Sequence, residues 1–93
     1  MARAFDHENA WMAILNYTPK QGQYLAFIYA YTTLNRRPPA EADMQAFFRV
    51  TPPSVHQMVL ELERRQLIRR TPRAARSIEL LIPAASLPLL EPT

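Results

Sequence analysis

The sequence lacks cysteine altogether and contains a single glycine among its 93 residues. Without cysteine it can form no disulfide framework, no thiolate metal site and no cysteine nucleophile. It has no glycine-rich phosphate loop, no paired carboxylates in a catalytic setting and no cluster with the spacing of metal ligands. We therefore expect a protein that is not an enzyme and that uses neither a metal nor a cofactor.

Long hydrophobic runs are also missing. No apolar run approaches the roughly 18 residues of a membrane span, and the first residues, MARAFDHENAW, contain no apolar core of a signal peptide. The length is that of one domain. The absence of cysteine fits a reducing compartment. We expect a cytoplasmic protein without a membrane partner.

Positive charge is concentrated in one short window. Residues 1–63 carry five basic and six acidic side chains, whereas residues 64–76 carry six arginines and no acid. These arginines are Arg64, Arg65, Arg69, Arg70, Arg73 and Arg76. Arginine offers a planar fork that fits phosphate groups and guanine edges. The window therefore indicates either a contact with a polyanion such as nucleic acid or a solvated surface run.

Helix signals divide the first two thirds of the chain. A short helix is expected over residues 6–16. Thr18, Pro19 and Gln21 form a capping-box start for a helix reaching Leu34. Its apolar stripe contains Tyr24, Leu25, Phe27, Ile28, Tyr31 and Leu34. The prolines of NRRPP break this helix, and a second helix is expected over residues 40–48.

The stretch TPPSVHQMVLELERRQLIRR begins with a third helix. Thr51 is a good N-cap residue, and Pro52 suits the first helical position because its missing N–H is not needed there. Pro53 is tolerated for the same reason. Val55, Val59 and Leu62 share one face. The prolines therefore stiffen the front of a helix that is expected to reach about Arg65.

Two short strands complete the pattern. Residues 67–70 and 77–82 read as strands, and the basic loop TPRAAR lies between them. The fold class is mainly α with a small β-hairpin, in the order of a winged helix-turn-helix: a three-helix core, a wing and an extra N-terminal helix. We expect an N-terminal helical extension over 1–17, the winged domain over 18–82 and a proline-rich tail over 83–93.

Several segments resemble the N-terminal DNA-binding domain of LexA repressors. They are YTPKQGQYLAFIYAYTTLNRRPP, TPPSVHQMVLELERRQLIRR and PRAARSIELL, which occur in the family's order and cover about residues 17–82. The resemblance implies that a helix reads bases in the major groove, which admits an α-helix. The family's second, peptidase domain has no counterpart in these 93 residues, so we expect no self-cleavage.

The family's base-contacting positions fall at the front of the third helix. They correspond to Thr51, Pro53, Ser54, His56 and Gln57. Here the sequence departs from the family: proline cannot donate to a base, and His56 and Gln57 replace an acidic pair found in some members. We expect an operator other than the standard SOS box. Two further departures are an alanine, residue 40, at the usual capping position of the second helix, which predicts a loose start, and a wing loop without glycine.

Phosphate contact is expected from the arginine window. Arg64 and Arg65 can pair with Glu61 and Glu63 along the helix. The other four arginines of the window have fewer acidic neighbours, which favours phosphate contact for them. The predicted contacts are Arg64, Arg69, Arg70, Arg73 and Arg76. The expected partner is double-stranded DNA, bound by a homodimer that forms through the N-terminal helix or the C-terminal tail, in a repressor-like regulator of transcription. A winged-helix protein-interaction module and an accessory DNA binder of a mobile element remain as alternatives.

Overall fold

The computed structural model describes residues 17–92, and the helix expected over 6–16 lies outside these residues. Three helices come first: α2 (Pro19–Asn35), α3 (Glu41–Phe48) and α4 (Pro52–Arg64). A two-stranded antiparallel hairpin, β1 (Ile68–Arg69) and β2 (Glu79–Leu80), follows, and one turn of 3-10 helix, Ala84–Ser86, lies in the tail. The predicted mainly helical class with a small hairpin is confirmed. No helix within residues 17–92 has the length and hydrophobicity to cross a bilayer.

Both threonine caps form as the sequence predicts. Thr18 accepts a hydrogen bond from the backbone N–H of Gln21 at 3.1 Å, and the Gln21 side chain accepts one from the Thr18 N–H at 3.0 Å. At α4, Thr51 accepts from the Ser54 N–H at 3.4 Å, and Pro52 and Pro53 occupy the first two helical positions. Each helix therefore begins at a position fixed by its own sequence.

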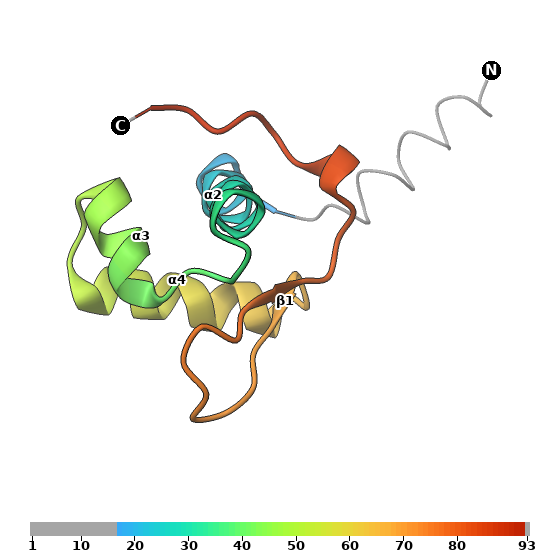
Figure 1. Ribbon diagram of the computed structural model, residues 1–93. Helices are drawn as coiled ribbons and strands as arrows, with labels where there is room; N and C mark the ends of the chain where they lie inside the picture. The colour runs from blue at the N-terminus through green and yellow to red at the C-terminus, as the bar shows by residue number, and fades with distance from the viewer. Residues whose placement is uncertain (1–16, 93) are drawn as a thin grey trace, which may run out of the picture.

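The core lies where the three helices meet the hairpin (Figure 1). Its fully buried members are Tyr24, Leu25, Ile28, Met44, Val55, Val59, Leu62, Leu67 and Ile68. Tyr24 stacks on Phe48 with ring centroids 4.1 Å apart, and this contact joins α2 to α3. The predicted inner face of α4 is confirmed.

The apolar stripe predicted for this helix ends with Leu34, but Leu34 does not belong to the buried face. The residue is 81% exposed. Residues of an α-helix advance by about 100° each, so Leu34 lies roughly 80° around the axis from Tyr24. That angle puts it at the rim of the buried face, in the last turn of the helix.

The hairpin strands are shorter than predicted, with two residues each. Ile68 pairs with Leu80, and Arg69 pairs with Glu79. Beyond them the Ser77 hydroxyl accepts from the Thr71 N–H and lies within hydrogen-bond distance of the Thr71 and Ala74 carbonyl oxygens. These side-chain bonds serve backbone groups that a longer ladder would otherwise pair.

The chain turns with non-glycine residues in the left-handed region. Among residues 17–92 these are Arg36, Arg49, Gln66, Arg73 and Arg76, with φ between 54° and 62°. Arg36 and Arg49 end α2 and α3, at positions where glycine is the usual choice. A side chain in this conformation costs about 1–2 kcal/mol.

We expect Arg49→Gly to stabilise the protein by about 1 kcal/mol, because glycine adopts a φ of 57° without strain. For a domain of this size the gain corresponds to a rise in Tm of about 4–8 °C, measurable by circular dichroism. Arg37→Gly is the matched control, because Arg37 does not adopt a positive φ. An equal rise in Tm for both variants would contradict the strain argument.

Candidate nucleic-acid interface

The five predicted base-contacting residues lie together on the exposed front of α4. Thr51, Pro53, Ser54, His56 and Gln57 are all exposed, whereas Val55 among them is buried. The Thr51 hydroxyl lies 3.0 Å from the Ser54 hydroxyl. No acidic residue occupies the first turn of α4, so the partial positive charge of the helix start is not neutralised.

His56 links this front to α3. Its Nδ1 lies 3.3 Å from Oε2 of Glu41, the first residue of α3. The same Glu41 oxygen lies 3.6 Å from an Nη of Arg70, which in turn binds Glu63 of α4 at 2.9 Å. This series of contacts joins the front of α4 to the wing, defined here as residues 70–78.

A lysine that was not assigned to the interface also lies at this front. Lys20, at the start of α2, lines a shallow hollow together with Pro53, Ser54 and Gln57 of α4. The sequence contained a signal for it: the capping box fixes Lys20 at the second position of α2, and it is exposed. Its placement beside α4 depends on tertiary packing.

The end of α4 carries a separate charge cluster. Arg64 donates to both carboxylate oxygens of Glu61, at 3.1 and 2.6 Å, and Arg65 donates to the same carboxylate at 2.7 Å. The hydrogen bonds from Arg64 and Arg65 lower the pKa of Glu61 to about 2. The predicted pairing with Glu61 is confirmed, while the described partner of Glu63 is Arg70.

Three of the four remaining window arginines have acidic partners that are distant in sequence. Arg69 binds Glu79 at 2.7 Å, Arg70 binds Glu63 at 2.9 Å and Arg76 binds Asp43 at 3.0 Å. The expectation that they have fewer acidic neighbours than Arg64 and Arg65 is therefore wrong for these three, because the hairpin, α3 and α4 bring acids to them. Phosphate contact itself stays a prediction.

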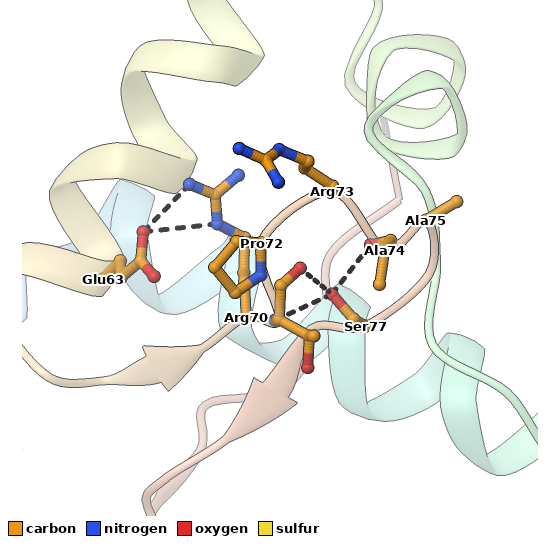
Figure 2. Close-up of a pocket in the computed structure, with 8 residues that line it drawn as sticks. Glu63, Arg70, Pro72, Arg73, Ala74, Ala75 and Ser77 are labelled. Atoms are coloured by element: carbon orange, nitrogen blue, oxygen red, sulfur yellow. Dashed lines mark hydrogen bonds and ion pairs between the residues drawn. The ribbon is translucent and has the colours of Figure 1, made fainter.

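Arg73 is the exception within residues 17–92, where it makes no ion pair or side-chain hydrogen bond. It is exposed near the middle of the wing. Figure 2 shows its side chain extending toward the guanidinium group of Arg70, whose two dashed contacts go to Glu63. An uncompensated guanidinium beside a second one is an arrangement that favours an anion.

Arg76 anchors the wing to the helices. One of its nitrogens lies 3.0 Å from the Tyr31 hydroxyl of α2, 3.0 Å from the Asp43 carboxylate of α3 and 3.4 Å from the Pro38 carbonyl oxygen. Its side chain is 31% exposed. These contacts identify Arg76 as a residue that positions the wing.

Asp43 also corrects the expectation of a loose start for α3. Alanine 40 has no side-chain acceptor, but its backbone N–H donates to Asp43 at 2.8 Å. This bond is the largest cause of the lowered pKa of Asp43, and the Arg76 charge also favours the ionised form. One carboxylate thus caps α3 and holds the wing.

Comparison with known proteins identifies relatives of this helical domain, although no family model matches the chain. LexA repressors of Thermosipho africanus (strain TCF52B) and Thermosipho melanesiensis (strain DSM 12029 / CIP 104789 / BI429) are each 38% identical to it over 64 residues. Those residues are 69% of this chain and 32% of each repressor.

The chain is similar to LexA repressors. The resemblance seen in the capping and wing segments is therefore confirmed. The matched region corresponds to an N-terminal DNA-binding domain of LexA type. The chain spans about a third of the length of these LexA repressors.

We expect the variant Asp43→Asn to have a free energy of unfolding that is lower by roughly 1 kcal/mol at pH 7. Asparagine can still accept a hydrogen bond from the Ala40 N–H, but it cannot form an ion pair with Arg76. The folded-state pKa of Asp43 lies below its ordinary value of 3.8. The stabilisation of the fold by the ionised Asp43 carboxylate is therefore present above that value and is lost as the pH falls through the folded pKa. Urea unfolding at several pH values measures this.

The two unfolding free energies should converge as the pH falls below 3.8 and through the folded pKa of Asp43, while the loss of stability caused by protonation of Glu61 should be the same in both proteins. Glu79→Gln is the control, since it removes an exposed pair with Arg69 and should cost only a few tenths of a kcal/mol. Parallel curves for wild type and Asp43→Asn would contradict the role given to Asp43.

Proposed function

We propose that this protein binds double-stranded DNA through the front of α4 and regulates transcription as a repressor-like protein. The observation that carries the proposal is the rigid, capped and exposed front of α4, which bears polar side chains and no acid in its first turn. A helix of this kind fits the major groove, and the positive end of its dipole favours a nearby phosphate. The likeness to proteins named LexA repressor supports the same function.

The roles of the residues follow from their positions. Gln57 can pair bidentately with adenine, and Ser54, Thr51 and His56 can contact bases or phosphates beside it. Pro53 contributes a fixed backbone and an apolar surface, since it has no N–H to donate. The departure of these side chains from those of some LexA repressors supports an operator different from the standard SOS box.

The arginines are proposed to contact the phosphate backbone in two ways. Arg73 can bind directly, because it has no carboxylate to leave within the described residues. Arg64, Arg69 and Arg70 would exchange a carboxylate for a phosphate, and the exposed side chains of Arg64 and Arg69 make this exchange inexpensive. Arg76 would act indirectly by fixing the wing.

A homodimer is part of the proposal. Two α4 helices about 34 Å apart would enter successive major grooves of one face of the duplex. Contact between the protomers is proposed through residues 1–16 or the tail. Sedimentation of the chain without residues 1–16, compared with the full chain, tests the first route: a dimer that persists at the same concentration would exclude it.

The DNA-binding proposal is tested by fluorescence anisotropy with a random-sequence duplex at about 50 and 200 mM salt. Each phosphate contact contributes about −0.9 to the slope of log K against log salt. We expect the variant Arg69→Ala/Arg70→Ala/Arg73→Ala to bind at least tenfold more weakly at the lower salt and to have a slope shallower by two to three.

Arg36→Ala is the control, because it removes one positive charge at the opposite end of α2 from Lys20. It should leave the affinity within about twofold, as it removes no proposed phosphate contact. A wild-type protein that does not bind DNA at the lower salt would refute the proposal and favour the protein-docking alternative.

A further inference from the structure

The segment Ser86–Pro92 crosses the first turns of α2, where it contacts Gln23 (Figure 1). The Tyr17 hydroxyl donates to the Ser86 carbonyl oxygen at 2.7 Å. Leu87 and Leu90 pack against the core from this segment, whereas Leu89 is 89% exposed. The segment is therefore held against the domain by Leu87 and Leu90, while Leu89 faces solvent.

Gln23 binds the backbone of this segment with both ends of its amide. Its Nε2 donates to the Leu89 carbonyl oxygen at 2.9 Å, and its Oε1 accepts from the Glu91 N–H at 2.8 Å. These two backbone groups flank Leu90, so the amide pairs with them as a neighbouring strand would. The arrangement fixes the position of Glu91 through its own backbone.

Gly22 makes this close approach possible. A Cβ atom at Gly22 would lie 2.7 Å from Cε1 of Tyr17 and 3.1 Å from Cγ of Pro88. Any side chain there would push both away from α2. The only glycine of the sequence is thus placed under the returning segment.

The segment delivers an acidic side chain to the edge of the candidate interface. Glu91 and Pro92 line a hollow together with Lys20, Gln23, Tyr24, Phe48 and Val50. Val50 immediately precedes Thr51, and Lys20 also lines the hollow that contains Pro53, Ser54 and Gln57. Lys20 makes no ion pair within residues 17–92. Because Lys20 lines both hollows, it lies between the front of α4 and Glu91.

We propose that Ser86–Pro92 is a regulatory strap that holds the Glu91 carboxylate at the rim of the DNA-binding surface and lowers the affinity for DNA. The inference rests on the proposed DNA-binding function. The carboxylate repels phosphates that approach Lys20 and attracts the Lys20 ammonium group itself. Both effects act over distances of the order of the Debye length, about 10 Å at 0.1 M salt. Release of the strap removes the carboxylate and raises the affinity.

The deciding variant is Glu91→Gln, which keeps the backbone bonds to Gln23 and removes only the charge. Binding to a random duplex is measured by anisotropy across a salt series. We expect about 1.5- to twofold tighter binding at 50 mM salt, the size produced by removing one charge about 10 Å from one or two phosphates in water after screening by the salt. The difference should become smaller at about 150 mM salt, where the Debye length is about 8 Å.

Two further variants separate the charge from the strap. Gln23→Ala removes both backbone bonds and should also tighten binding, while Gln23→Ala/Glu91→Gln should bind no more tightly than Glu91→Gln alone, because a released carboxylate no longer acts. Leu89→Ala, at an exposed position of the same segment, is the control and should bind like the wild type. Thermal unfolding confirms that each variant is folded.

The outcomes separate the two proposals. A wild-type protein that binds DNA with the same affinity as Glu91→Gln at 50 mM salt refutes the strap while the DNA-binding function stands. A wild-type protein that binds no DNA refutes both. If Gln23→Ala does not fold, the comparison of wild type with Glu91→Gln still decides the question.

Discussion

The carboxylate of Asp43 is the contact on which the arrangement of the other elements depends. It accepts the Ala40 N–H at the start of α3 and pairs with Arg76 of the wing, which also contacts Tyr31 of α2. Three elements are therefore oriented by one half-buried ion pair. The hydrophobic core alone would allow the wing to tilt, since the hairpin contributes only two paired residues on each strand. This contact holds the wing against α2 and α3.

The remaining charges form a surface that is less basic than its sequence suggests. Carboxylates of Glu61, Glu63 and Glu79 meet Arg64, Arg70 and Arg69 respectively. An arriving phosphate competes with these carboxylates, so the exchange contributes less free energy than an uncompensated arginine would. Arg73 has no such competitor within the described residues, and Lys20 makes no ion pair there, although Glu91 lines a hollow beside it. Arg73 and Lys20 would consequently contribute more of the affinity for a polyanion than the paired arginines.

The local features could be predicted from the sequence, and the distant ones could not. Thr18 and Thr51 gave correct helix starts because a cap depends on residues within three positions. The buried face of α4 followed from spacing alone. The pairing of Arg76 with Asp43 spans 33 positions, and no local pattern contains such information. Lys20 was missed for the same reason, since its proximity to α4 arises only when α2 and α4 pack together.

The turns of this chain have a consequence for the entropy of association. Within residues 17–92, five residues with side chains occupy left-handed conformations in which most proteins use glycine. Residues of this kind restrict the backbone of the unfolded chain more than glycine does, and two of them, Arg73 and Arg76, are in the wing. The wing loop is therefore preorganised. Its backbone is already ordered when a partner arrives, and Arg76 is held by Tyr31 and Asp43, so less conformational freedom is lost in the complex.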